Sequence, residues 1–261
     1  MNRLLVALVL ALPEIARAQV QPTQRPPLFT TKDALWSAAV LAGAIGLSAA
    51  DVDIAAGFNN ETHRSASRDR FARNFAKVQE GSLTIGNLAL WGIGRLTRAD
   101  ALADITFHAA EAVVVGSAAS QLIRGPLGRS RPHVTNFEDQ YDFKPFRGFR
   151  EFEYRAFPSI HTASAFAVAT VYVLETDRRA PHVTWFVAPV AYLLALGPGV
   201  SRMYTGQHWA SDVLAGAFMG TLAGFKIVRY NHDVRPDNPV NRFFLGREAT
   251  SGFTFRYSIG F

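Results

Sequence analysis

The chain contains no cysteine among its 261 residues. A disulfide framework and a thiolate metal site are therefore both excluded, and an oxidising compartment is tolerated. The sequence also lacks HExxH and similar metal-binding motifs, and it lacks any recognisable nucleic-acid-binding motif. Internal repeats and low-complexity tracts are missing as well. We expect no metal, no other cofactor and no nucleic-acid partner.

Long apolar runs are scarce. A membrane-spanning helix needs about 20 predominantly apolar residues, and most runs in this chain are shorter. The apolar segments are 34–50, 82–94, 100–123, 161–174, 183–200 and 212–228. Alanine and glycine dominate them, which favours closely packed helices. The sequence predicts an all-α bundle of about six helices, with loops at 51–81 and 133–157 and helix ends at Gly125 and Gly197-Pro198-Gly199. Both a membrane-embedded and a soluble form stay open; 34–50, 156–174 and 183–201 could span, so we favour the membrane.

The two ends of the chain carry patterns of their own. A basic start, an apolar core at 4–12 and an Ala16-Arg17-Ala18 site predict a cleaved signal peptide over residues 1–18. We expect export to a bacterial cell envelope, either in the membrane with a periplasm-facing site or in the periplasm. A linker (19–31), the helical domain (32–232) and a tail (233–261) would follow. The last eleven residues alternate as in a strand, which would pack on the surface or pair with residues 241–245.

Positive charge exceeds negative charge, and the formal net charge is +6. Such a chain attracts anionic membranes or anionic substrates. Several cationic residues fall in three short stretches: Arg124-x6-Arg131-Pro132, Pro158-Ser159-Ile160-His161 and Ser201-Arg202-x5-His208-x3-Asp212. Together these stretches supply guanidinium groups, a hydroxyl, two imidazoles and a carboxylate. That set can hold a phosphate dianion and attack it without a metal.

The third stretch contains a candidate nucleophile. His208 and Asp212 are four residues apart, so on a helix they share one face. We expect Asp212 to accept a proton from one ring nitrogen of His208 and leave the other nitrogen free to attack phosphorus. The alternative is a structural pair at a helix N-terminus.

Arginine suits the remaining electrostatic work, because its planar fork binds two phosphate oxygens and stays charged. Arg124, Arg131 and Arg202 would bind the equatorial oxygens. The alternative for the first two is a basic cluster at a helix end that complements the helix dipole or binds lipid head groups. Arg129 lies outside the pattern, and we assign it only that second role.

The middle stretch precedes an apolar run of helical character. Ser159 is expected both to cap that helix and to bind phosphate. His161 is the candidate general acid, which protonates the leaving group and then activates water. The alternative is a capping or packed histidine.

The order and spacing of these stretches resemble the signature of the type 2 phosphatidic acid phosphatase (PAP2) and vanadium haloperoxidase superfamily. The resemblance covers residues 124–212 and implies a PAP2-type helical bundle, metal-independent hydrolysis and a phosphohistidine at His208. Two positions depart from the family pattern: Arg124 replaces the usual lysine and Ile160 the usual glycine. The first changes hydrogen-bond geometry, and the second adds bulk beside the phosphate.

The function predicted is hydrolysis of phosphate monoesters or pyrophosphates, with a phosphorylated lipid as substrate and a small organophosphate second. Three alternatives stay open: a vanadate-dependent haloperoxidase, a soluble periplasmic acid phosphatase, and a silent lipid-binding membrane protein. The loop 133–157 contains eight aromatic residues and could cover the site or pack against the bundle. The oligomeric state stays open.

Overall fold

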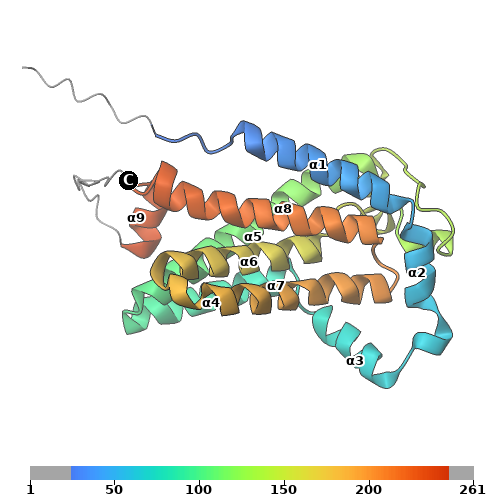
Figure 1. Cartoon of the computed structure of the whole chain (residues 1–261), viewed down its shortest axis with the longest axis horizontal. Helices are drawn as coiled ribbons and strands as arrows, with labels where there is room; N and C mark the ends of the chain where they lie inside the picture. Colours follow the sequence, from blue (N-terminus) through green and yellow to red (C-terminus); the bar gives the residue numbers. More distant parts are fainter. Residues whose placement is uncertain (1–24, 247–261) are drawn as a thin grey trace, which may run out of the picture.

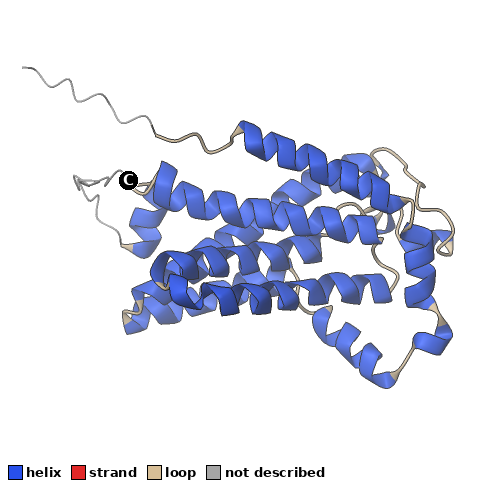
Figure 2. Cartoon of the chain, viewed as in Figure 1, coloured by secondary structure: helices blue, strands red, loops and turns tan. Residues whose placement is uncertain are grey.

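The computed structural model describes residues 25–246. Within that range the chain is helical and contains no strand, which confirms the all-α prediction (Figure 2). The helices are α1 (Thr31–Ser48), α2 (Asp51–Asn59), α3 (Ala66–Phe75), α4 (Glu80–Thr97), α5 (Asp100–Leu127), α6 (Ile160–Arg179), α7 (Pro181–Tyr204), α8 (Ala210–Arg229) and α9 (Pro239–Leu245). Short 3₁₀ turns lie at Glu61–His63 (η1), Pro132–Thr135 (η2), Arg147–Phe149 (η3) and Phe152–Tyr154 (η4), and a π-helical turn, Tyr230–Val234 (η5), follows α8.

Six long helices, α1 and α4 to α8, correspond to the six apolar segments. The expected loop 51–81 is wrong, because it contains α2 and α3. Segment 241–245 belongs to the short helix α9, so it offers no strand for the tail to pair with. The expected signal peptide, residues 19–24 of the linker and the strand-like end lie outside the described residues, and the domain boundaries stay a prediction.

The glycines expected to end helices lie inside them instead. Gly125 is in α5, and Gly197 is in α7. A side chain at Gly125 would collide with the ring of Phe149, and one at Gly197 would collide with the ring of Phe75. Each glycine therefore marks the close approach of an aromatic ring, not a helix end.

Small residues bring the central helices together, as the composition predicts. Helix α8 turns Gly220 and Gly224 toward α6, where a Cβ atom would collide with the Ala163 carbonyl or lie 2.8 Å from the Ala167 carbonyl. A core of buried residues lies between α5, α6 and α8, made of Ala109, Ala112, Ala167, Val171 and Val228. Such close backbone approach is typical of helices packed inside a membrane.

Three helices, α5, α7 and the segment Ala210–Val234, are long and apolar enough to cross a membrane, and α1 with α2 could form a fourth, bent span. Helix α7 also exposes large apolar side chains, with Trp185 77% and Leu193 70% exposed. An exposed apolar face of this kind matches lipid better than water. Length, composition and exposure together indicate a membrane protein.

Helices α4 to α8 run in alternating directions along the bundle (Figure 1). The C-terminal ends of α5 and α7 and the N-terminal ends of α6 and α8 therefore gather at one end of the bundle. The connection between α5 and α6, in yellow-green, lies at that end beside α2 (Figure 1). All three sequence stretches fall there.

Candidate active site

Two arginines converge on one glutamine side chain at this end of the bundle. Arg131, just after α5, and Arg202, in the last turn of α7, both donate to Oε1 of Gln207, the latter at 3.1 Å. Arg131 also lies over the ring of Phe152, 3.9 Å from its centroid. Burial lowers the pKa of Arg131 to about 10, so its guanidinium stays charged at neutral pH.

The third arginine, Arg124, is buried in the last turn of α5 and donates from Nε to the Arg155 carbonyl at 2.8 Å. Within residues 25–246, neither Arg124 nor Arg202 has a carboxylate within 4.0 Å. Two guanidinium groups without an ion-pair partner leave this end of the bundle with excess positive charge. That charge suits a multiply charged anion.

His208 has one ring nitrogen bound and the other free. Its Nδ1 donates to the Ala156 carbonyl at 2.7 Å, because a carbonyl oxygen can only accept. Its Nε2 is buried and has no hydrogen-bond partner in the described part of the chain. Burial, reinforced by Arg124 and Arg202, holds the pKa of His208 well below its usual value. The imidazole is therefore neutral, with its lone pair on Nε2.

His161 lies in the first turn of α6, and the same arginines act electrostatically on its ring. Burial and then Arg202 lower the pKa of His161 to about 3, with further contributions from His208, Arg124 and Arg131. Its Nδ1 is buried and unpartnered among the residues described. The structure thus gathers two neutral imidazoles and three guanidinium groups around one region.

Asp212 does not hold His208 as the spacing predicts. Helix α8 begins only at Ala210, so His208 precedes it. The nearest Asp212 oxygen lies 3.6 Å from His208 Nδ1, beyond hydrogen-bond distance. Instead, Oδ2 of Asp212 accepts from the Trp209 backbone N–H at 2.8 Å and caps α8. The backbone carbonyl of Ala156 orients His208, and Asp212 contributes a nearby negative charge.

The role of Arg129 was not predicted from the sequence. Its guanidinium is buried and donates to Asp212 Oδ1 at 2.5 Å and to Asp51 Oδ2 at 2.8 Å. It also donates to the Ser211 hydroxyl and the Gln140 carbonyl. Arg129 therefore ties α2, the α5–α6 connection and the start of α8 together. In the sequence, only its position two residues before Arg131 could have indicated this role. Nothing in the sequence indicated that Gln207 or the Ala156 carbonyl belongs to the site.

Ser159 is the N-cap residue of α6 by position, yet its hydroxyl caps no backbone N–H and accepts from the Thr162 hydroxyl at 2.9 Å. Its own backbone N–H donates to the Asp212 carbonyl at 3.0 Å. Ile160, the departure from the family pattern, is buried at the next position. Gly216 of α8 lies so close that a side chain there would collide with the Ser159 carbonyl. The N-terminal ends of α6 and α8 are thus held in direct backbone contact.

The aromatic connection packs in part against the bundle, which is one of the two expectations for it. Tyr154 is buried, accepts from Lys144 at 2.8 Å and lies under Arg147. Other rings stay exposed, with Phe146 67% and Phe152 56% exposed. Part of the connection packs onto the bundle, and the exposed ring of Phe152 lies against Arg131.

Comparison with known families agrees with this geometry. A model of the PAP2 superfamily matches residues 106–236, half of the chain, which includes all three stretches. The chain belongs to the PAP2 superfamily. This confirms the resemblance, and with it the helical fold class.

Individual relatives match shorter parts. A lipid A 1-phosphatase of Porphyromonas gingivalis is 46% identical over 69 residues, covering 26% of this chain and 15% of that protein. A lipid A 1-phosphatase of Rhizobium etli is 31% identical over 108 residues, covering 41% of this chain and 42% of that protein. The matches thus span less than half the length of these PAP2 relatives.

Two solved structures also resemble the chain. The crystal structure of Aquifex aeolicus LpxE gives a TM-score of 0.47 at 23% identity, covering 69% of this chain and 95% of that one. A PAP2-type phosphatidylglycerolphosphate phosphatase of Bacillus subtilis gives 0.35 at 18% identity, covering 75% and 98%.

Proposed function

We propose that this chain is a metal-independent phosphatase of the PAP2 superfamily that hydrolyses a phosphate monoester or pyrophosphate on a membrane lipid. The observation that carries the proposal is the unpartnered Nε2 of neutral His208 among three buried or half-buried guanidinium groups. The guanidinium groups of Arg124, Arg131 and Arg202 bind the phosphate oxygens. Arginine and imidazole donors fit an anion, and the nearby carboxylate of Asp212 is already bound by Arg129.

In the first step, the lone pair of His208 Nε2 attacks phosphorus and a P–N bond forms. The P–O bond to the leaving group breaks, and that oxygen takes a proton from His161. Without substrate, His161 is neutral, because its pKa is about 3. A bound phosphate dianion offsets the arginine charges that depress this pKa, so the proton is held only when substrate is present.

In the second step, His161 takes a proton from water, and the resulting hydroxide attacks phosphorus. The P–N bond breaks, inorganic phosphate leaves, and the lone pair returns to His208 Nε2. The Nδ1–H of His208 keeps its bond to the Ala156 carbonyl, which stabilises the positive charge on the phosphohistidine ring. Asp212, 3.6 Å from that nitrogen, adds to the stabilisation.

A phosphorylated lipid fits the surroundings better than a small soluble ester. The exposed ring of Phe152 lies against Arg131, and the bundle carries apolar faces suited to a bilayer. The relatives named lipid A 1-phosphatases make a lipid A-type sugar 1-phosphate the first substrate to assay. Phosphatidate, isoprenoid pyrophosphate and soluble esters are the next.

The test is phosphate release from this panel by the wild type and by His208→Gln, with His182→Gln as a control at an exposed position outside the site. We expect His208→Gln to lower kcat by about 10⁴-fold or more, since the substitution removes the attacking nitrogen. Vanadate should inhibit, and the pH profile should be bell-shaped. Activity lost in chelator and restored by a divalent metal, in protein that stays folded throughout, would contradict the mechanism.

A further inference from the structure

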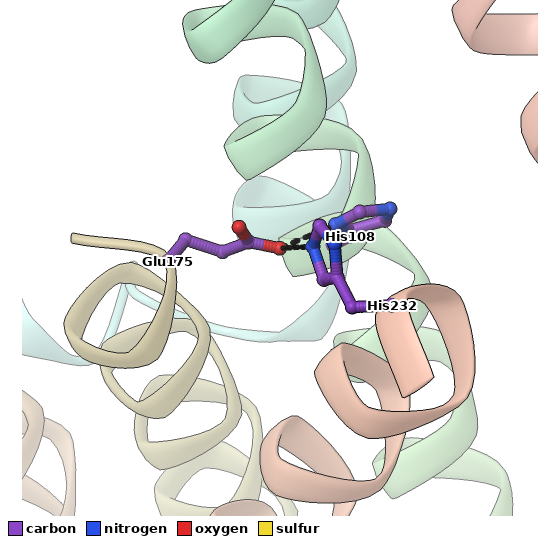
Figure 3. Close-up of side chains that lie close together, drawn as sticks. All are labelled: His108, Glu175 and His232. Carbon is purple, nitrogen blue, oxygen red and sulfur yellow. Dashed lines mark hydrogen bonds and ion pairs between the residues drawn. The ribbon is translucent and has the colours of Figure 1, made fainter. Parts of the chain in front are cut away.

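A second cluster of chemically active side chains lies far from the phosphate site. His108 of α5 and Arg124 of the active site are 16 residues apart on one helix, which corresponds to about 24 Å. Around His108 gather Glu175, near the C-terminal end of α6, and His232, in the π-helical turn η5 (Figure 3). The cluster therefore belongs to the opposite end of the bundle, and the proposed hydrolysis makes no use of it.

The two imidazoles point at the same carboxylate oxygen. Nδ1 of His108 lies 2.6 Å, and Nε2 of His232 lies 2.8 Å, from Oε1 of Glu175 (Figure 3). The ligand atoms of the three residues all lie within 4.8 Å of one another. The rings meet edge to face, with centroids 5.3 Å apart. Two ring nitrogens and one carboxylate oxygen this close together form a ligand set that zinc accepts.

We propose that His108, Glu175 and His232 bind one Zn²⁺ ion that fastens the end of α8 to α5 and α6. Zinc–ligand bonds of about 2.0–2.2 Å place neighbouring tetrahedral ligands roughly 3.3 Å apart. Small side-chain rotations, which open the present separations by about 0.5–0.7 Å, admit the ion. Water completes the tetrahedron.

Burial makes this cluster unlike a chance group of surface residues. The side chains of His108 and Glu175 are fully buried, and that of His232 is 14% exposed. The second oxygen of Glu175 accepts from Arg179, which in turn pairs with Asp104 at 3.0 Å. These outer contacts fix the carboxylate in place, as outer contacts do in metal sites.

The charge around the cluster also suits a divalent cation. Near the two imidazoles lie three carboxylates, Glu175, Glu111 and Asp104, and one guanidinium, Arg179. The carboxylates outnumber the guanidinium group, and a divalent cation would offset that excess of negative charge. The competing arrangement is a metal-free network in which each ring donates one N–H to Oε1 of Glu175. Zinc keeps both rings neutral, which is the form that binds metal.

The position of His232 depends on the π-helical turn. Helix α8 ends at Arg229, and η5 carries the chain over the end of the bundle. Asn231 in this turn donates to Glu111 at 2.8 Å and accepts from Asn238 at 2.9 Å. Turns of this kind recur at functional sites. The bound ion would hold the turn on the same helices.

The test uses full-length protein in detergent, purified with a tag free of histidine, stripped with chelator and dialysed against Zn²⁺. We expect one zinc ion per wild-type chain by elemental analysis, and loss of that ion in His108→Gln and His232→Gln. At free Zn²⁺ about 100 times the dissociation constant, the Tm of the wild type should rise by about 5–10 °C. His182→Gln, altered at an exposed position, should bind zinc as the wild type does.

Two further measurements keep the proposal open to refutation. If the His108 and His232 variants do not fold, Co²⁺ added to the stripped wild type should give the visible absorption of four-coordinate cobalt. His208→Gln should keep its zinc while losing phosphatase activity, which separates this site from the proposed function. Equal zinc content in wild type and folded cluster variants, or a wild-type Tm that Zn²⁺ leaves unchanged, would show that the cluster is a hydrogen-bonded network without metal.

Discussion

Arg129 supplies the buried positive charge for two carboxylates, Asp51 and Asp212, whose side chains are fully buried. Through Asp212 it also supports the N-terminal cap of α8, which directly follows His208. A buried charge that loses its partner is strongly destabilising, whereas the pair itself contributes little net stability. Removal of Arg129 would therefore leave Asp51 and Asp212 buried without a counter-charge.

We predict that Arg129→Gln lowers the free energy of unfolding by about 3–5 kcal/mol, because two carboxylates are left buried without a counter-charge. Thermal unfolding in detergent measures the effect. Arg150→Gln, on the same connection but exposed, should change stability by no more than about 0.5 kcal/mol. Adding Asp51→Asn to Arg129→Gln removes one stranded charge and should recover part of the loss. If Arg129→Gln and Arg150→Gln are equally stable, Arg129 has no such role.

At the scale of secondary-structure elements, the pairing of α6 with α8 sets the geometry of the active site. Helix α6 begins beside Ser159, and α8 begins beside His208. Glycines on α8 let the two helices touch through their backbones, and Gly216 is the glycine that meets Ser159. A change in this spacing would move His161 relative to His208.

Gly216→Ala tests that spacing. The added methyl group collides with the Ser159 carbonyl, and overpacking of this kind costs about 1–3 kcal/mol. We expect a lower Tm and a fall in kcat, because the start of α6 must shift. Gly86→Ala is the matched control: Gly86 lies within α4 and a Cβ atom there meets nothing within 4 Å. That control should be neutral or slightly stabilising, since alanine is the better helix former. Matching effects of the two variants would refute the argument.

The apolar segments predict the six long helices because burial and small residues decide those elements. Helix α3 escapes prediction because its sequence is mostly polar and charged, with only Ala72 buried. The family pattern points to the site residues, but not to their hydrogen bonds. His208 finds the Ala156 carbonyl, which is 52 residues away in sequence, and Asp212 finds Arg129, which is 83 residues away. Such partners depend on how the α5–α6 connection folds, and spacing within one segment carries no information about that.

At the scale of the whole molecule, the alternating helices separate two chemical centres. The arginines and His208 gather at one end of the bundle, and the cluster of His108, Glu175 and His232 lies near the other. If α5, α7 and α8 cross a bilayer, these centres face opposite membrane surfaces. Substrate would then be bound from one side, and zinc would fasten the helix ends on the other.

The absence of native cysteine allows a direct test of this arrangement. Single substitutions Arg150→Cys, on the α5–α6 connection, and Asp177→Cys, near the end of α6, place one thiol at each end of the bundle, both at exposed positions. A membrane-impermeant maleimide added to cells with a permeabilised outer membrane should label the Arg150→Cys variant. The Asp177→Cys variant should react only after the inner membrane is opened, because the bilayer core of about 30 Å excludes the reagent. Labelling of both variants before the inner membrane is opened would mean that the helices between them do not cross the membrane.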